Sequence, residues 1–153
     1  MTLETGQEAP DFSLRDQHGQ EVSLSSFRGE KAVVVMFYPY AFSRVCTGEL
    51  CAVRDELSTF ENDAVAVLSI SVDSVFSHRI FAEQEKLTFP LLSDFWPHGE
   101  VAQAYGVFDE NLGAAVRGTF IVDKDGIVRW SVVNAIPDAR SNEDYKAALA
   151  ALS

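Results

Sequence analysis

Residues 32–50 read AVVVMFYPYAFSRVCTGEL, and a change of pattern within this stretch decides the fold. Ala32 to Tyr38 is a continuously apolar run rich in β-branched residues, which is typical of a strand covered on both faces. Pro39 ends this run, and from about Ser43 the apolar residues recur every three or four positions, as they do in a helix. A buried strand that leads directly into a helix indicates an α/β protein.

Outside this stretch, the sequence alternates between strand and helix patterns. The expected elements, in chain order, are a β-hairpin around His18-Gly19, a helix over residues 43–60, a strand over 65–72, a helix from Asp73 or Ser74 to Lys86, a strand at Leu91-Leu92, a helix at 100–105, a hairpin over 118–133 and a helix over 142–152. This order predicts an α/β, thioredoxin-like fold with a central mixed sheet flanked by helices and an N-terminal β-hairpin extension. The chain has no repeat or linker-like segment, so a single domain over residues 1–153 is expected.

Composition and charge narrow the class of protein. Apolar residues make up 47% of the chain, a normal share for a globular domain, and no run is long enough to span a membrane. Twenty-three acidic and twelve basic side chains give a net charge of −11, which argues against nucleic acid or an anionic membrane as a partner. The first residues do not resemble a secretion signal, so a cytoplasmic location is expected, where a thiol pair is more often reactive than permanently bridged.

The chain has two cysteines, Cys46 and Cys51, and both fall in the predicted helix that follows the first long strand. If Ser43 caps this helix, Cys46 lies in its first turn, where unpaired backbone N–H groups and the helix dipole favour negative charge. Cys46 is then expected to ionise more readily than a free thiol, and the thiolate is the reactive form. The Ser43 hydroxyl can reach the sulfur much as a cap reaches that position. The competing interpretation of Cys46 is a packed apolar residue without chemistry.

Cys51 has two interpretations. Residues five apart in an ideal helix have Cα atoms about 8–9 Å apart, whereas a disulfide needs less than roughly 7 Å. The two cysteines therefore cannot bond while the helix is intact. Cys51 is either a packed residue, or it meets an oxidised Cys46 after the first turn unwinds. A metal site is not expected, because zinc requires four closely spaced ligands and the three histidines are scattered singly.

These residues resemble the active-site motif of peroxiredoxins. Pro39, Ser43 and Cys46 match its Pro-x-x-x-Thr/Ser-x-x-Cys pattern, and Arg117 in AAVRGTFIVD matches the distant active-site arginine of that family. The likeness covers nearly the whole chain, through APDFSLRDQHG, FYPYAFSRVC, FPLLSDFWPHGEVAQAYGVF and RGTFIVDKDG. The FWPHG…AYGVF segment is most similar to the AhpE subfamily of one-cysteine peroxidases. The spacing from Cys46 to Cys51 is instead similar to that of the resolving cysteine in the peroxiredoxin Q (bacterioferritin comigratory protein) subfamily.

The resemblance implies a thiol-dependent peroxidase that reduces hydrogen peroxide and organic hydroperoxides, with peroxynitrite as a further candidate, and that needs no metal or organic cofactor. Cys46 would attack the peroxide and become a sulfenic acid. Arg117, the Ser43 hydroxyl and the backbone N–H groups of Val45 and Cys46 would stabilise the charge that spreads along S–O–O. Pro39 would shield the sulfur from water.

The resemblance leaves the recycling route open. Oxidised Cys46 would react either with Cys51, followed by reduction by a thioredoxin-like protein, or with a low-molecular-weight thiol that a glutaredoxin- or mycoredoxin-like protein removes. Glu49, one helical turn after Cys46, would bind Arg117, transfer protons or simply face solvent. A homodimer through the loops around the active-site helix is also implied.

Two other functions are compatible with the same fold. A peroxide sensor or redox relay would pass its oxidation to a partner protein and turn over little, whereas a binding module would react slowly with peroxide. Three aromatic residues, Phe42, Trp96 and Phe108, are candidates for an apolar substrate mouth or a subunit contact. Core packing is the simpler expectation for each of them.

Overall fold

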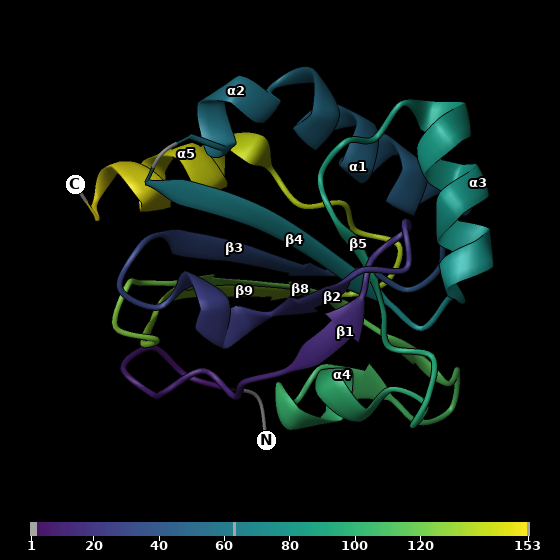
Figure 1. Cartoon of the computed structure of the whole chain (residues 1–153), viewed down its shortest axis with the longest axis horizontal. Coiled ribbons are helices and arrows are strands. Elements are labelled where there is room, and N and C mark those ends of the chain that lie inside the picture. The colour runs from purple at the N-terminus through teal and green to yellow at the C-terminus, as the bar shows by residue number, and fades with distance from the viewer. Residues whose placement is uncertain (1–2, 63, 153) are drawn as a thin grey trace.

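The computed structural model describes residues 3–62 and 64–152, which are arranged around a seven-stranded sheet (Figure 1). In spatial order its strands are β2 (Glu21–Ser23), β1 (Ser13–Arg15), β5 (Leu91–Ser93), β4 (Val65–Ser71), β3 (Ala32–Phe37), β8 (Arg117–Val122) and β9 (Val128–Asn134). The three central strands β3, β4 and β5 run parallel, while β1, β2, β8 and β9 add antiparallel pairs on either side. The predicted mixed sheet and N-terminal hairpin are confirmed.

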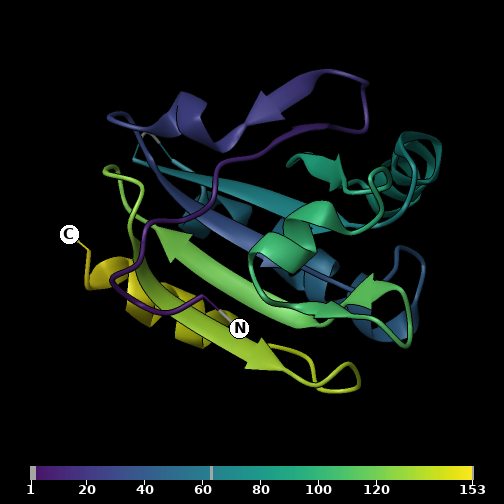
Figure 2. The same cartoon turned by 90° about the horizontal axis from the view of Figure 1, so that it is seen from below.

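Helices cover both faces of this sheet. They are the 3₁₀-helix η1 (Leu24–Phe27), α1 (Arg44–Asp55), α2 (Leu57–Phe60), α3 (Val75–Glu85), α4 (Glu100–Ala104) and α5 (Asn142–Ala150). Figure 1 shows α1, α2, α3 and α5 on one side of the strands and α4 on the other. Turned by 90°, the molecule shows α4 and the first residues of the chain on the near side of the sheet (Figure 2). No helix in the described residues has the length and apolar character needed to cross a membrane.

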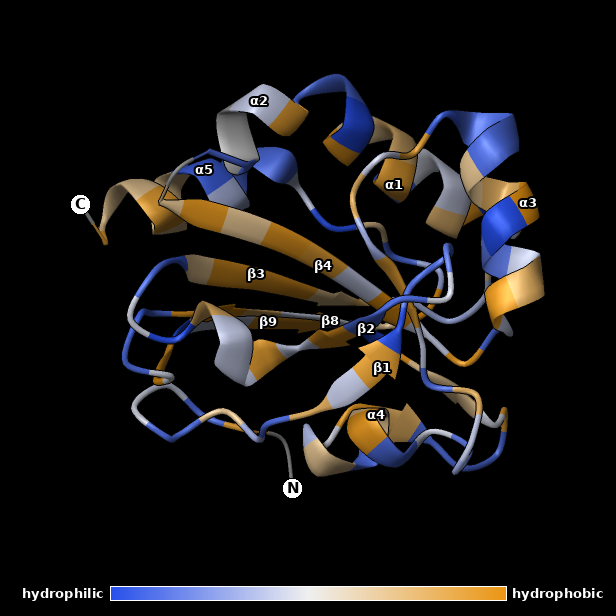
Figure 3. Ribbon diagram, in the orientation of Figure 1, coloured by the Kyte–Doolittle hydropathy of each residue, from blue (hydrophilic) through white to orange (hydrophobic). Residues whose placement is uncertain are grey.

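Burial on both faces explains why β3 is continuously apolar. In β3, Val33, Val35 and Phe37 belong to a core shared with α4, η1 and the N-terminal segment. Val34 and Met36 point the other way and pack against α1, α3 and α5. Successive side chains of a strand face opposite sides of the sheet, so apolar residues are favoured at every position of a strand that is covered on both faces. The orange band of apolar strands at the centre of Figure 3 shows this arrangement.

The structure differs from the sequence prediction in two connections. A single helix was expected over residues 43–60, but α1 ends at Asp55 because Glu56 has a non-helical backbone (φ −116°, ψ 22°). The Glu56 carboxylate accepts hydrogen bonds from the side chains of Lys146 and Asn142 of α5, at 2.6 and 2.8 Å, so packing against a distant helix fixes this residue. The second difference is a small hairpin of β6 (Phe108–Asp109) and β7 (Ala114–Ala115), which no local pattern predicted.

The loop between β3 and α1 sets where α1 begins. Within it, Phe42 has a left-handed backbone (φ 70°), which costs a non-glycine residue about 1–2 kcal/mol and so must be stabilised by its surroundings. Ser43 returns to an extended conformation as the N-cap, and α1 starts at Arg44. The chain thereby turns from the carboxyl end of β3 back over the sheet, which places the first turn of α1 at the strand ends.

Candidate active site

Cys46 is completely buried on α1, and the guanidinium of Arg117 reaches its sulfur from β8. Nη1 of Arg117 lies 3.2 Å from Cys46 Sγ. The pairing of β8 with β3 brings together two residues that are 71 positions apart in the sequence. Cys46 is the third residue of α1, so its N–H group and the two before it have no intrahelical acceptor. The positive end of a helix and a guanidinium therefore converge on one sulfur.

Glu49 joins this arrangement from the next turn of α1. It is only 6% exposed, so it does not face solvent. Its Oε1 accepts a hydrogen bond from Arg117 Nη1 at 2.6 Å, which is the same nitrogen that contacts Cys46. The Nε of Arg117 donates to the carbonyl of Ile136. The carboxylate and the carbonyl together fix the orientation of the guanidinium beside the sulfur.

Arg140, which sequence reasoning missed, completes the site. Its backbone N–H and its Nε donate to Glu49 Oε2 at 2.6 and 2.8 Å, and its Nη2 donates to Glu49 Oε1 at 2.8 Å. Its Nη1 donates to the carbonyls of Phe37 and Gly118, at 2.6 and 2.8 Å, which ties the guanidinium to β3 and β8. The only sign of this residue in the sequence is a single arginine in the polar stretch PDARS, residues 137–141, which matches no motif.

The electrostatics of Glu49 follow from these contacts. Burial alone would raise the pKa of Glu49, but the hydrogen bonds and charge of Arg140, helped by the charge of Arg117, outweigh burial and lower this pKa. Glu49 is then an ionised carboxylate that accepts four hydrogen bonds and has no proton to give. The geometry therefore supports an anchoring role toward Arg117 rather than proton transfer.

Ser43 does not make the contact expected of it. Its hydroxyl donates to the carbonyl of Tyr40 at 3.0 Å, and it makes no side-chain cap hydrogen bond with α1. In the part of the chain that the structure describes, no hydrogen bond joins Ser43 to Cys46. The turn at Phe42 brings the Tyr40 carbonyl close to the hydroxyl, and a carbonyl oxygen is a stronger acceptor than a thiol sulfur.

A pocket opens at the start of α1, next to Arg117. Pro39, Ser43, Val45 and Arg117 line it, so four residues predicted for the site surround one opening, while Cys46 itself does not line it. Its remaining walls are largely apolar and come from Tyr40, Leu112, Ile136 and Pro137, with Arg44 at the edge. The Tyr40 hydroxyl donates to the carbonyl of Leu112 at 2.6 Å, which joins the loop after β3 to the turn between β6 and β7.

The three aromatic residues predicted for the core or for a substrate mouth behave differently from one another. Trp96 is 81% exposed and Phe42 is 49% exposed, so core packing was the wrong expectation for these two. Phe108 is half-buried and packs against the core on the α4 side. None of the three lines the pocket beside Cys46.

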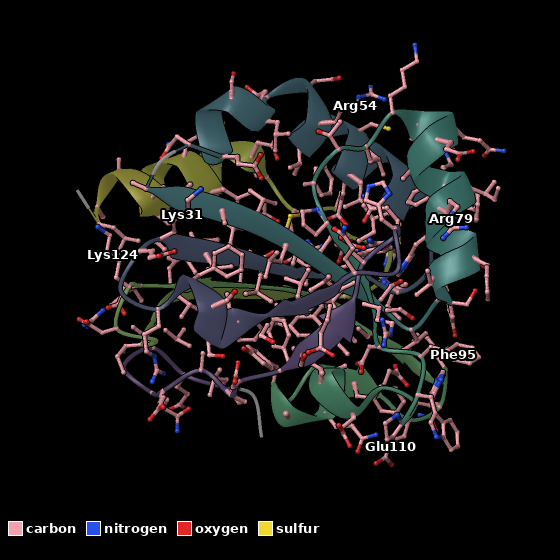
Figure 4. All side chains as sticks on the ribbon, in the orientation of Figure 1. Lys31, Arg54, Arg79, Phe95, Glu110 and Lys124 are labelled. Atoms are coloured by element: carbon pink, nitrogen blue, oxygen red, sulfur yellow. The ribbon has the colours of Figure 1, made fainter. Side chains whose placement is uncertain are left out.

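Cys51 faces away from Cys46, although both lie on α1. Both thiols are free, and α1 is continuous between them. Five helical residues correspond to about 140° of rotation, so the side chains leave opposite sides of the helix. Cys51 Sγ donates to Glu85 Oε1 of α3 at 3.3 Å, and burial together with this hydrogen bond raises the pKa of the Cys51 thiol. Arg54, labelled in Figure 4, extends from α1 to the same part of α3, where it donates to the Glu85 carbonyl.

Comparison with known proteins places this site in a family. The model of the AhpC/TSA family matches residues 5–131. The chain belongs to the AhpC/TSA family. It is 52% identical to alkyl hydroperoxide reductase E of Mycobacterium tuberculosis (strain ATCC 25618 / H37Rv), with 99% of each chain covered. It is 37% identical to the chloroplastic 2-Cys peroxiredoxin BAS1 of Spinacia oleracea, over 96% of this chain and 58% of that protein.

Solved structures agree with this placement. Peroxidoxin BcpB from Mycobacterium tuberculosis matches with a TM-score of 0.87 and 33% sequence identity over 99% of both chains. AhpC from Enterococcus faecalis matches with a TM-score of 0.89 and 31% identity, over 99% of this chain and 93% of that chain. These relatives confirm the resemblance to peroxiredoxins, the thioredoxin-like fold and the activity class of thiol-dependent peroxidase.

The buried ion pair predicts a large effect of Arg140→Met on stability. The substitution leaves a fully buried carboxylate with one guanidinium instead of two, and breaking a buried pair costs about 3–5 kcal/mol. We expect the free energy of unfolding, measured in urea, to fall by this amount. The matched control is Arg129→Met, which breaks the solvent-exposed pair with Asp123 and should cost less than about 1 kcal/mol. Equal losses in both variants would contradict the anchoring role of Arg140.

Proposed function

We propose that Cys46 is the residue through which this peroxidase reduces its substrate. The Cys46 thiolate attacks the terminal peroxide oxygen, an S–O bond forms and the O–O bond breaks. The sulfur is oxidised to a sulfenic acid, and the second oxygen leaves as an alkoxide or hydroxide that takes up a proton to become an alcohol or water. The observation that carries this assignment is the 3.2 Å contact between Cys46 Sγ and Arg117 Nη1 at the start of α1.

Arg117 acts on the charge that spreads from sulfur over the two peroxide oxygens. The guanidinium is already oriented by Glu49 and Ile136, so it needs little reorganisation when the transition state forms. Preorganised donors of this kind give the largest stabilisation where water is excluded, and Arg117 is 2% exposed. The backbone N–H groups of Val45 and Cys46 supply further donors from the first turn of α1.

The pocket beside Cys46 supports organic hydroperoxides as substrates in addition to hydrogen peroxide. It is lined by the polar residues Ser43, Arg44 and Arg117 and also by the apolar residues Leu112, Ile136 and Pro137. An apolar substituent on the peroxide would remove its surface from water against these walls. The peroxide group would then lie between Ser43 and Arg117.

Two variants test the catalytic assignment. Cys46→Ser is expected to abolish peroxide consumption, because serine cannot accept the oxygen atom under these conditions. Arg117→Gln is expected to lower the rate constant for oxidation by about 10²–10³-fold, as loss of one preorganised donor does elsewhere. Rapid mixing with hydrogen peroxide measures both. Arg129→Gln, at an exposed ion pair, is the control and should react as the wild type does. Consumption of peroxide by Cys46→Ser at the wild-type rate would refute the assignment.

We further propose that an external thiol recycles the sulfenic acid, in preference to Cys51. Cys51 lies on the opposite side of α1, its thiol donates to Glu85, and its raised pKa lowers the thiolate fraction available for attack. An internal disulfide would require the first turns of α1 to unwind and this hydrogen bond to break. A small thiol, or a thioredoxin-, glutaredoxin- or mycoredoxin-like protein, does not require the hydrogen bond between Cys51 and Glu85 to break.

Intact mass after one equivalent of peroxide separates the two routes. We expect a gain of about 16 mass units in the wild type and in Cys51→Ser alike, because the sulfenic acid has no partner within the chain. A loss of about two mass units in the wild type that is absent in Cys51→Ser would show an internal disulfide instead. Either result leaves the assignment of Cys46 intact.

We also propose that the chain forms a homodimer through an exposed apolar surface on the α3 side. Large exposed apolar side chains gather there from the loop after β3, from α3 and from the segment after β5, namely Phe42, Phe76, Ile80, Phe95 and Trp96. Arg79 on α3 and Phe95 project toward the same side of the molecule (Figure 4). Large apolar side chains that are exposed close to one another are typical of protein–protein contacts.

Phe76→Asp tests this contact. A charge at a side chain that is 75% exposed should cost the monomer little but should weaken an apolar interface. We expect sedimentation velocity to show a dimer for the wild type and a shift toward monomer for the variant. Leu152→Asp, at an exposed leucine near the C-terminus, is the matched control. A wild-type protein that sediments as a monomer would exclude the dimer.

A further inference from the structure

A second buried polar cluster lies beneath the loop that carries the active-site motif. It consists of Tyr38 at the end of β3, Ser71 at the end of β4, Asp73 and His78 of α3, and we refer to it as the Asp73 cluster. Tyr38 and His78 are fully buried, and Ser71 is 1% exposed. Among the described residues, no hydrogen bond or ion pair joins its members to Glu49, Arg117 or Arg140, so the peroxidase chemistry derived above does not account for it.

The donor and the acceptor can be assigned for two hydrogen bonds of the Asp73 cluster. The Ser71 hydroxyl donates to Asp73 Oδ2 at 2.6 Å, and Ser71 Oγ lies 2.7 Å from His78 Nε2. Because the hydroxyl proton is already used on the carboxylate, the Ser71 oxygen accepts from His78 Nε2–H. In this arrangement Nε2 of His78 carries a proton. Burial lowers the pKa of His78 to about 4 against the opposing charge of Asp73, which is consistent with a neutral ring.

Asp73 also binds the loop between β3 and α1, which carries the active-site motif. Its Oδ2 accepts the backbone N–H of Ala41 at 2.7 Å. Ala41 directly precedes Phe42, whose left-handed backbone needs support, and the Phe42 ring packs on Phe81 of α3 with ring centroids 5.0 Å apart. Asp73 is itself fixed from β5, because Ser93 Oγ donates to its carbonyl at 2.7 Å. The loop thus lies on a rigid support made by β4, β5 and α3.

We infer that Asp73 is a positioning residue for the peroxidase reaction, which fixes where α1 begins and hence the placement of Cys46 Sγ against Arg117. This inference rests on the role proposed for Cys46. The sulfur comes from α1 and the guanidinium from β8, so their alignment depends on how each element is anchored. Glu49 and Arg140 anchor the second turn of α1, whereas Asp73 anchors the chain just before its first turn. A misplacement of about 1 Å at a reacting centre can cost about 10²-fold in rate.

Two reagents distinguish positioning from a merely structural role. Hydrogen peroxide and iodoacetamide both require the Cys46 thiolate, but only the peroxide reaction depends on alignment with Arg117. In a Cys51→Ser background, we expect Asp73→Ala to lower the rate constant with peroxide at least about tenfold while the alkylation rate changes less than about threefold. Asp73→Asn keeps an oxygen for the Ala41 N–H group and should restore most of the peroxide rate.

The control is Asp16→Ala. The Asp16 side chain is buried, whereas the Asp73 side chain is partly exposed. Like Asp73, Asp16 accepts hydrogen bonds from backbone N–H groups, those of His18 and Gln20, in the turn of the N-terminal hairpin. Its removal should lower the thermal unfolding temperature without changing the ratio of the two rate constants. If Asp73→Ala does not fold, Ser71→Ala is the variant measured, because it keeps the carboxylate but removes its hydroxyl donor. It should also lower the ratio of the peroxide rate to the alkylation rate.

Two results would overturn the inference. The first is a wild-type ratio of the two rates in Asp73→Ala, whether both rates are unchanged or both change in parallel. The second, where Asp73→Ala does not fold, is a wild-type ratio in Ser71→Ala. Failure of the proposed function looks different, because the wild type itself would then react slowly with peroxide and Cys46→Ser would change nothing.

Discussion

The carboxylate of Glu49, held between two buried guanidiniums, is the interaction on which the rest of the site depends. One charged group on α1 binds Arg117 of β8 and Arg140 of the segment before α5, so three parts of the chain meet at a single carboxylate. Isolated buried charges are very costly, whereas this carboxylate has four donors and each of the two arginines donates to a further carbonyl. The cost of burying the charges is therefore offset by hydrogen bonds that also fix geometry. A guanidinium held in this way is available to a sulfur at 3.2 Å without first having to be oriented.

Much of this fold could be predicted because its signals are local. Six consecutive apolar residues indicate that β3 is buried on both faces, and Pro39 marks the end of that strand. The positions of Cys46 and Arg117 were named from motifs, and the sheet brings them together because β8 pairs with β3. What could not be predicted depends on long-range contacts. No local pattern marks Arg140, and only the folded chain shows that it binds Glu49, a residue 91 positions away in the sequence.

The same reasoning explains the errors on either side of the site. The break between α1 and α2 at Glu56 comes from side chains of α5, which no helical periodicity in residues 43–60 can reveal. The Ser43 hydroxyl was expected at the sulfur, but a left-handed residue at position 42 brings a carbonyl within its reach. Core packing was the simpler expectation for Trp96 as an aromatic residue, yet this residue is 81% exposed. In each case the outcome depends on the path of the backbone or on residues distant in the sequence, and the local sequence pattern contains neither.

The two cysteines show how one helix can give the same side chain different chemistry. Cys46 lies at the N-terminal end of α1, inside the core, and its sulfur faces a guanidinium. Cys51 lies one and a half turns later, on the side facing α3, and its thiol donates to a carboxylate. Burial and the neighbouring Glu85 carboxylate raise the pKa of the Cys51 thiol and so lower its thiolate fraction, whereas the Cys46 sulfur lies beside a guanidinium that can stabilise the charge of the transition state. For the Cys51 thiol to reach Cys46, the first turn of α1 would have to unwind, and this would remove the backbone N–H donors that the peroxide reaction uses. The geometry that makes Cys46 reactive is thus the same geometry that separates it from the second thiol.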